Sequence, residues 1–430
     1  MPVPTYSAHR DHLNTIRRAI HAAADPAQAM ERTLAVAPGQ LLAGERSFPL
    51  KPTNALYLIA FGKASSAMTQ AAINTLGDRI SGGVVAIPSG GSLSAAGMRV
   101  FHGGHPLPDQ GSLAAGKAVG ELLARTHPGD LVLVLISGGG SAMLEWPLPG
   151  VQLQDLRRLT ELLLQCGAPI EDINIVRKAL SRTKAGGIAR LAAPARCISL
   201  ILSDVVGDRL TAIASGPTVL RRVTPEDARR VLMQYHIWDK APDRIKSTLS
   251  LPLRSAVRSP RPHNVLIGSN RLALSAAAAA AEHLGFAPQI VSRQMHGEAR
   301  STAARFTRAL LRVRPGTCLL MGGETTVTIQ GTGTGGRNQE FALAASLLLP
   351  AQPPRAVMSL ATDGVDGPTD AAGAIVTSET RQLAKAAHLD VEAALDNNDS
   401  YNVLDPLNAL IRTGPSGTNV NDIVVGLTYT

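Results

Sequence analysis

Aromatic residues and cysteines are scarce in this chain of 430 residues. Phe, Trp and Tyr together make up 3% of the sequence, which leaves little material for a surface that stacks nucleic-acid bases. The cysteines, Cys166, Cys197 and Cys318, are far apart and form no Cys-x-x-Cys pair. This usage argues against a disulfide framework and is typical of a protein in a reducing compartment.

Long hydrophobic runs are also missing. The start of the chain lacks the apolar core of a signal peptide, and the alanine run at 276–281 is too short to span a membrane. We therefore expect a cytoplasmic protein without a membrane partner. With 45% hydrophobic residues, rich in Ala, Leu and Val, the chain is typical of a globular α/β protein of two or three domains.

The formal net charge is +9, but the positive charge is distributed unevenly along the sequence and does not indicate a single basic face. Residues 221–261 hold ten Lys or Arg against four acids, whereas residues 363–430 hold three against ten. This distribution argues against a nucleic-acid-binding protein. The basic stretch could attract anionic ligands, but we interpret it as a solvated linker. Residues 219–262 are also rich in proline, so we place the domain boundary there, with domains at 1–255 and 256–430.

The strongest structural signal is the stretch 131–141, LVLVLISGGGS. Its apolar run has no alternation, which predicts a strand buried on both faces, as in a parallel sheet. The three glycines between Ser137 and Ser141 allow positive φ and bring backbone N–H groups close to a ligand. If a helix follows, its N-terminus favours an anion such as a phosphate or a carboxylate. The alternative is a tight strand-to-helix turn without a ligand.

Polar and charged residues follow most of the other strands that we expect. In open parallel sheets, ligands bind at the carboxyl ends of the strands. The pair Asp204 and Asp208 suits a metal cation or a general base, and an Asx turn is the alternative for Asp204. His102 and His105 share a loop, but their spacing alone is not a metal signature. Lysine, arginine, carboxylates and glycine-rich backbone together suit phosphoryl transfer. The residues at these strand ends are Lys63, Gly138, Gly139, Gly140, Asp204, Glu324, Arg337 and Asp363.

A series of motifs resembles, in the same order, those of the bacterial and animal glycerate 2-kinases of the MOFRL type. The resemblance runs from about Phe61 to Leu427 and covers nearly the whole chain. The motifs are FGKASSAM, HPLPD, LISGGGSAM, INIVRKALSRTKAGGIA, ILSDVVGD, IASGPT, GGETTVTI, GGRNQEFALA, ATDGVDGPTDAAGA, DNNDSY and TGPSGTNVNDI.

The resemblance implies a cytoplasmic kinase that phosphorylates D-glycerate at its 2-hydroxyl with ATP and Mg²⁺. It also implies an α/β fold, with a Rossmann-like parallel-sheet N-terminal domain and a smaller α/β C-terminal domain. The latter would include a MOFRL-type region at about 317–428, and the active site would lie in the cleft between the domains. A homodimer is compatible with the resemblance, and no nucleic-acid partner is expected.

By motif, the catalytic residues that the resemblance implies are Lys63, Asp204 and Arg337. We expect the metal at Asp204 and Asp208. The residues expected to bind substrate or nucleotide are Ser137, Gly138, Gly139, Gly140, Ser141, Glu324, Asn338 and Asp363. This sequence departs from the family pattern at Val206, where proline is common, and at Glu145–Trp146, which is bulkier than usual and bears on substrate choice.

An NAD(P)H-dependent hydroxypyruvate reductase is the main alternative, because members of the family have often carried that label. Residues 331–336, GTGTGG, fit the dinucleotide motif G-x-G-x-x-G. The preceding residues 325–330 alternate in polarity, however, and predict a half-exposed antiparallel strand rather than a buried first strand. Asp363 also lies 27 residues past Gly336, too far for the usual ribose contact. A binding module based on the basic stretch would leave the polar strand ends unexplained.

Arg337 follows this glycine-rich loop and begins an expected helix. An arginine at a helix N-terminus is electrostatically unfavourable unless an anion shares the site, and a transferring phosphoryl group would supply one. The alternative is a surface arginine paired with a nearby acid. We expect the variant Arg337→Ala to melt within a few degrees of the unaltered protein but to lose most of its turnover.

Overall fold

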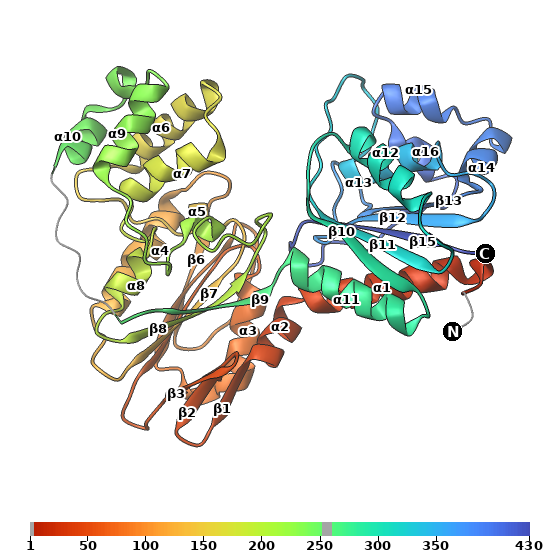
Figure 1. Ribbon diagram of the computed structural model, residues 1–430. Helices are drawn as coiled ribbons and strands as arrows, with labels where there is room; N and C mark the ends of the chain where they lie inside the picture. The colour runs from red at the N-terminus through yellow and green to blue at the C-terminus, as the bar shows by residue number, and fades with distance from the viewer. Residues whose placement is uncertain (1–3, 252–259) are drawn as a thin grey trace. The chain divides into compact units, whose positions relative to one another are not determined.

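Figure 1 shows the computed structural model, which describes residues 4–251 and 260–430. The described residues divide into two units, each with its own large sheet. The N-terminal unit comprises those within Pro26–Ser203 and Asp208–Ile267. The C-terminal unit comprises those within Met1–Asp25, Asp204–Gly207 and Gly268–Thr430.

The N-terminal unit is built on a sheet in which β4 and β7 are central neighbours. Its described strands follow the order β6-β5-β4-β7-β8-β9, and the neighbours from β6 to β8 are parallel. Counted along the chain, this is the order 3-2-1-4-5-6 of a doubly wound, Rossmann-type sheet. The predicted fold class is therefore confirmed. The strands are β4 (Leu56–Phe61), β5 (Gly82–Pro88), β6 (Met98–Gly103), β7 (Leu131–Ile136), β8 (Arg196–Leu202) and β9 (His263–Gly268).

Helices and a small antiparallel sheet surround these strands. The small sheet has the order β1-β2-β3. Its strands are β1 (Leu34–Ala37), β2 (Gln40–Ala43) and β3 (Arg46–Pro49), and the helices of this part are α2 (Pro26–Thr33), α3 (Ser65–Leu76), α4 (Gln110–Leu123), α5 (Gly140–Met143) and α8 (Gly187–Leu191), with short 3₁₀ turns at Gly77–Arg79 and Ile213–Ser215.

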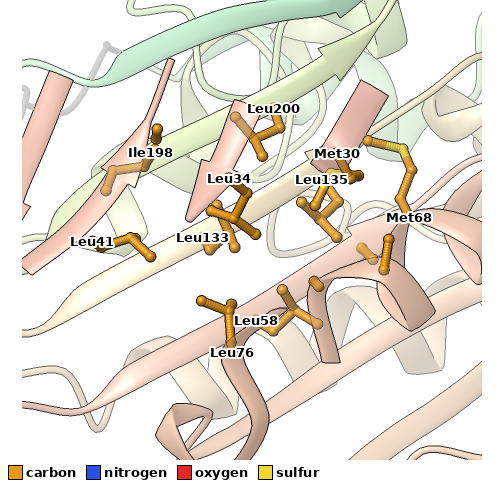
Figure 2. Packing of buried hydrophobic residues seen from close by; sticks show 14 of the residues in the cluster. Met30, Leu34, Leu41, Leu58, Met68, Leu76, Leu133, Leu135, Ile198 and Leu200 are labelled. Atoms are coloured by element: carbon orange, nitrogen blue, oxygen red, sulfur yellow. The ribbon is translucent and has the colours of Figure 1, made fainter. Parts of the chain in front are cut away.

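The strands of the large sheet are apolar because helices and the small sheet bury their side chains. Leu58 is paired in register with Leu133, and Leu133 with Ile198, and all three are buried. Figure 2 shows these side chains packed with Met30 of α2 and Leu34 of β1. Because apolar neighbours cover the strand residues on either side, β7 has no polar alternation, as the sequence predicted.

A second hydrophobic core holds together four helices of the N-terminal unit. Leu163, Ile173, Leu232 and Ile245 are among its buried residues. The described part of the basic stretch is therefore packed helix rather than the solvated linker that its composition suggested. The helices are α6 (Leu153–Gln165), α7 (Ile170–Ala179), α9 (Pro225–Gln234) and α10 (Asp243–Ser250), with a 3₁₀ turn at Trp238–Lys240.

The C-terminal unit contains a mixed sheet. Its described strands follow the order β10-β11-β15-β12-β13-β14, with β10 and β11 parallel and the other neighbours antiparallel. The strands are β10 (Ala287–Met295), β11 (Thr317–Gly323), β12 (Arg355–Ala361), β13 (Gly373–Thr377), β14 (Leu410–Ile411) and β15 (Asp422–Thr428). The helices are α1 (His9–Ala24), α11 (Asn270–His283), α12 (Ala299–Leu310), α13 (Arg337–Ser346), α14 (Thr380–Ala386), α15 (Val391–Asp396) and α16 (Ser400–Leu404), with a 3₁₀ turn at Tyr6–Ala8.

The helix α1 belongs to the C-terminal unit although it lies at the start of the chain. It packs against α11 and buries Leu13, Ile16 and Ile20. The His12 ring lies edge-on to Phe286, with 5.3 Å between ring centroids. No local pattern in the sequence points to this partner, which lies more than 240 residues away along the chain.

The chain thus passes between the units more than once, whereas the sequence predicted one boundary between residues 255 and 256. That position lies outside the described residues, and the boundary stays a prediction. The strand β9, whose residues fall within the predicted second domain, is instead the edge of the N-terminal sheet. The antiparallel strand expected at 325–330 is wrong: Thr326 makes an isolated bridge to Glu298, whose carboxylate accepts hydrogen bonds from Thr326 and Thr328.

Within the described residues, no helix has both the length and the apolar character needed to cross a membrane.

Candidate active site

The ends of β4 and β7 meet at the point where the strand order of the N-terminal sheet reverses. Ligands in doubly wound sheets bind in the crevice outside such a point. Two loops are joined there: the backbone N–H of Lys63 donates to the carbonyl of Gly138 at 2.8 Å, and that of Ala64 donates to Oγ of Ser137 at 3.0 Å. Gly62 is required at this junction, because its φ is 114° and a Cβ would lie 2.4 Å from the carbonyl oxygen of Ser137.

The predicted glycine turn after β7 has the conformation that its sequence implied. Gly139 has a φ of 78° and immediately precedes the short helix α5. A Cβ at Gly139 would lie 3.0 Å from Cδ2 of His105 and 3.3 Å from Cγ of Lys63. The Ser141 hydroxyl is 2.8 Å from that of Ser215. The turn is therefore narrow, is flanked by basic side chains and presents hydroxyl groups.

Two of these neighbours, His105 and Arg177, were not assigned a role from the sequence. His105 lies in the loop before α4, which is fixed by a capping box between Asp109 and Ser112. Arg177 lies on α7, and its Nη2 donates to the carbonyl of Ser141 at 3.1 Å. Both occur inside motifs that carry the family resemblance, HPLPD and INIVRKALSRTKAGGIA, and this was the available signal.

Of the departure at Glu145–Trp146, Glu145 is buried and Trp146 is half-buried. The Glu145 carboxylate accepts hydrogen bonds from Ser181 at 2.6 Å and from the buried Lys184 at 2.5 Å. The guanidinium carbon of Arg182 lies 3.6 Å from the Trp146 ring centroid. Burial lowers the pKa of Lys184, while the charge of Glu145 opposes that shift. These bulky residues therefore serve internal packing and pairing.

Asp204 and Asp208 follow β8 and fall in different units. Asp204 belongs to the segment Asp204–Gly207 of the C-terminal unit, and Asp208, with a φ of 53°, belongs to the N-terminal unit. Each has interactions within the protein. No group of three or more His, Cys, Asp or Glu side chains arranged to hold a metal ion occurs among the described residues. A metal at these two carboxylates stays a prediction.

Arg337 is the centre of an ionic cluster in the C-terminal unit. Its Nε and Nη2 donate to the two carboxylate oxygens of Asp422, at 2.6 and 2.9 Å, and its Nη1 lies 2.9 Å from Glu324. Arg337 begins α13, Asp422 begins β15, and Glu324 follows β11. The Asp422 side chain is 1% exposed, whereas that of Glu324 is 44% exposed. The arginine expected to meet a substrate anion is thus paired with two protein carboxylates.

A third carboxylate, Asp366, occupies the N-terminus of α13. Its oxygens accept hydrogen bonds from the backbone N–H groups of Asn338 and Gln339. The Asn338 amide also donates to Asp366 and accepts from the Ser359 hydroxyl at 2.7 Å. Asn338 is buried, so the structure shows its amide in internal contacts, whereas a ligand contact there stays a prediction. Asp363, the other predicted binding residue of this region, accepts from the Val365 backbone N–H at 3.2 Å.

Burial governs the protonation of this cluster. It raises the pKa of Asp422 to about 7, against the opposing effect of Arg337. It also raises the pKa of Asp366, although several N–H donors favour the carboxylate there. Burial works to lower the pKa of Arg337, but the hydrogen bonds and charge of Asp422 and the charge of Glu324 raise it above its usual value. Arg337 is therefore a permanent cation near two buried carboxylates, Asp422 and Asp366, that ionise with difficulty.

In the glycine-rich loop 331–336, the backbone N–H groups of residues 331–334 donate hydrogen bonds to other parts of the protein. The Asn398 side chain accepts from the N–H groups of Gln330 and Gly331, Asn397 accepts from Thr332 through its side chain and from Gly333 through its carbonyl, and Asp399 accepts from Thr334. Most of the N–H groups that a G-x-G-x-x-G motif would offer to a pyrophosphate are thus bonded to the DNND segment. This geometry argues against the reductase alternative, which depended on this loop as a phosphate cradle.

Comparison with known proteins gives matches over both units. The model of a domain of unknown function, DUF4147, matches residues 12–250, and the model of the MOFRL family matches residues 317–422. A glycerate 2-kinase of Pyrococcus horikoshii is 39% identical over 420 residues, which cover 94% of each chain. A D-glycerate 2-kinase of Thermotoga maritima is 40% identical over 89% of this chain and 93% of its own. The crystal structure of a Thermotoga maritima glycerate kinase superposes with a TM-score of 0.89 at 36% identity, covering 98% of this chain and 100% of that one.

Proposed function

Because the chain belongs to the MOFRL-type glycerate kinase family, we propose that it transfers the γ-phosphoryl group of ATP to the 2-hydroxyl oxygen of D-glycerate. The products are ADP, 2-phosphoglycerate and the proton lost by the hydroxyl. The observation that carries this proposal is the extent of the kinship: identity near 40% with named glycerate 2-kinases extends over both units. A likeness restricted to the Rossmann-type sheet would indicate only a fold.

In this proposal, Lys63 neutralises phosphate charge at the reversal point of the N-terminal sheet. Its side chain is exposed, and among the described residues no acid pairs with it. A lysine acts on phosphate as a mobile point charge and needs no fixed geometry. The turn from Ser137 to Ser141 approaches the ligand with its backbone, because Gly139 removes the side chain that would stand in the way.

Arg337 contributes positive charge that stabilises the transition state. Glu324 and Asp422 orient its guanidinium group. Both oxygens of Asp422 hold the Nε–Nη2 edge, so Nη1 is the part nearest the exposed Glu324. Electrostatic stabilisation of this kind dominates phosphoryl transfer, because little covalent chemistry is left to the protein. Glu324 and Asp363 remain proposed ligands of substrate or nucleotide.

The proposed metal is Mg²⁺ at Asp204 and Asp208. Mg²⁺ binds through one or two carboxylates together with substrate phosphates, so a set of three protein ligands is not needed. Mg²⁺ held there together with ATP would neutralise phosphate charge. Asp204 is also the proposed group that accepts the hydroxyl proton. The proposed compartment is the cytoplasm, which the unpaired state of Cys166, Cys197 and Cys318 supports.

Two assays on the purified protein test the proposed function. Release of ADP from ATP with D-glycerate and Mg²⁺ is expected, and the product should be 2-phosphoglycerate, which enolase consumes directly. Oxidation of NADH with hydroxypyruvate should stay at the level of a blank. NADH oxidation at enzyme-like rates without ADP release would contradict the proposal.

A matched pair of lysine variants tests the role of Lys63. Lys63→Met should lower kcat by roughly 10²-fold or more, since it removes a charge that the transferring phosphoryl group needs. Lys51→Met removes an exposed lysine elsewhere in the N-terminal unit and should leave kcat unchanged. Equal activities in the two variants would remove Lys63 from the mechanism.

A further inference from the structure

Three basic side chains gather around the turn Gly138–Ser141 in the N-terminal unit. A Cβ at Gly139 would lie within 3.3 Å of atoms of both His105 and Lys63, and Arg177 donates to the carbonyl of Ser141. Across the described residues, no acidic side chain forms an ion pair with Lys63, His105 or Arg177. Three basic groups without an anion, around a turn that a glycine keeps open, are an unusual arrangement for a protein surface.

We propose that Lys63, His105 and Arg177, together with the turn Gly138–Ser141, form a binding site for an oxyanion. In terms of the proposed function, on which this assignment of ligand rests, the oxyanion is either the carboxylate of D-glycerate or a phosphate of the nucleotide. His105 and Arg177 are then ligand-binding residues that act beside Lys63.

Arg177 carries the strongest argument. Its guanidinium has five N–H donors, and the described protein groups take one of them, through Nη2 and the carbonyl of Ser141. The acid that influences Arg177 is Glu145. Glu145, however, is held by Lys184 and Ser181. A partly buried guanidinium with unused donors and no carboxylate of its own fits an oxyanion from outside the protein.

His105 adds a second group beside the turn, with its Cδ2 3.0 Å from the position of a Cβ at Gly139. Its loop is fixed by the capped start of α4, so the ring is positioned without contacts to its own nitrogens from the described residues. Partial burial lowers the pKa of His105, and the facing charges of Lys63 and Arg177 lower it further. An anion between these groups would reverse the effect of the two charges, so its binding should raise the pKa of His105.

The packing of the turn explains why the site needs glycine. Any side chain at Gly139 would fill the space between the His105 ring and the Lys63 stem. Gly140 is equally confined, since a Cβ there would lie 2.7 Å from the Phe61 ring. The backbone can therefore reach an oxyanion that the three basic groups surround.

Isothermal titration of the full-length protein with inorganic phosphate, D-glycerate and ADP, each alone, tests the proposal. We compare the unaltered protein with Arg177→Gln, His105→Ala and the control Lys178→Gln. Lys178 is the next residue on α7 and also donates to a backbone carbonyl, that of Thr211 at 2.8 Å, away from the turn. Loss of a charge-assisted hydrogen bond should weaken phosphate binding by about ten-fold or more in the first two variants, and the control should bind normally.

The two organic ligands identify the source of the oxyanion. A parallel loss of D-glycerate affinity with ADP unaffected assigns the site to the carboxylate, and the reverse result assigns it to a nucleotide phosphate. Near-normal phosphate binding in both Arg177→Gln and His105→Ala, or an equal loss in Lys178→Gln, would overturn the proposal. His105 is exposed, so its variant remains informative if Arg177→Gln fails to fold.

The proposed function can fail separately from this site. A protein that releases no ADP with D-glycerate, yet loses phosphate binding in Arg177→Gln, has the oxyanion site without the proposed activity. A protein that phosphorylates D-glycerate with full activity in both variants has the activity without the site.

Discussion

Replacing Arg337 by methionine should destabilise the C-terminal unit in a way that depends on pH. Methionine keeps most of the side-chain length but removes the partner of Asp422, which is 1% exposed. The sequence alone led us to expect a nearly unchanged melting temperature for Arg337→Ala. The pairing of Arg337 with Asp422 changes that expectation, because a buried carboxylate left without its cation is costly.

The pKa of Asp422 sets the size of the effect. In the unaltered protein this pKa is raised to about 7. Protonated Asp422 therefore makes its full contribution to the free energy of unfolding below about pH 4, and this contribution is lost as the pH rises to about 7. Without Arg337 the pKa rises further, so the variant goes on losing about 1.4 kcal/mol per pH unit above 7. Adding about 1 kcal/mol for the lost hydrogen bonds, the deficit is about 1 kcal/mol at pH 6 and about 3 kcal/mol at pH 8.5. The exposed pair with Glu324 adds only about 0–1 kcal/mol.

Urea unfolding at pH 6 and pH 8.5 measures this deficit, and the molecule contains an internal control. Trp146 and Trp238, its only tryptophans, lie in the N-terminal unit, so their fluorescence should report a transition that Arg337→Met leaves in place. Far-UV circular dichroism should report the additional loss. The double variant Arg337→Met/Asp422→Leu should recover stability at pH 8.5, since no charge is then left buried.

Measurements of kcat distinguish the stabilising role of Arg337 from its proposed role in phosphoryl transfer. At pH 6, where the variant is nearly as stable as the unaltered protein, kcat should still fall by about 10³-fold. The stabilised double variant should remain equally inactive. Identical pH profiles of stability for Arg337→Met and the unaltered protein would refute the pairing argument.

Three further predictions concern single side chains. Asp422→Asn should remove the part of the pH dependence of the unfolding free energy that Asp422 contributes between pH 5 and 7, at most about 1.4 kcal/mol per pH unit, as a urea series would measure. Gly139→Val should abolish phosphate binding in calorimetry. The control Gly167→Val, at a similar positive φ but with no atoms nearby, should lower stability only. Normal phosphate binding by both variants would show that the turn only connects β7 to α5. Gly120→Ala should lower stability by about 1–3 kcal/mol and shift the fluorescence of Trp146, because a Cβ there would lie 2.1 Å from that ring; an unshifted spectrum would contradict the packing.

The parts of the fold that the sequence predicts are those with a local signal. The run before Ser137 lacks alternation because a parallel strand is covered on both faces, so β7 and its glycine turn could be predicted. The resemblance added the Rossmann-type class. The placement of β4 beside β7 brings Lys63 to Gly138, and no local pattern reveals that pairing, because the strands are about seventy residues apart in the chain.

The site could be predicted only in part for the same reason. The position of Arg337 at a helix start correctly indicated a nearby anion, but that anion is Asp422, a residue 85 positions away. His105 and Arg177 have no periodicity to mark them, since each is a single basic residue in a loop or on a helix. The polarity alternation at 325–330 predicted a strand, whereas tertiary hydrogen bonds to Glu298 hold that segment as a loop.

The position of α1 makes the N-terminal unit an insertion within the C-terminal one, and this constrains folding during synthesis. α1 leaves the ribosome before the N-terminal unit, and its partner α11 follows only about 250 residues later, which takes roughly 12–50 s at typical rates of translation. The N-terminal unit has its own core and can fold in that interval. During this time the apolar face of α1, with Leu13, Ile16 and Ile20, stays exposed to solvent. A nascent chain of this protein therefore exposes this apolar face of α1 to aggregation until α11 has been synthesised.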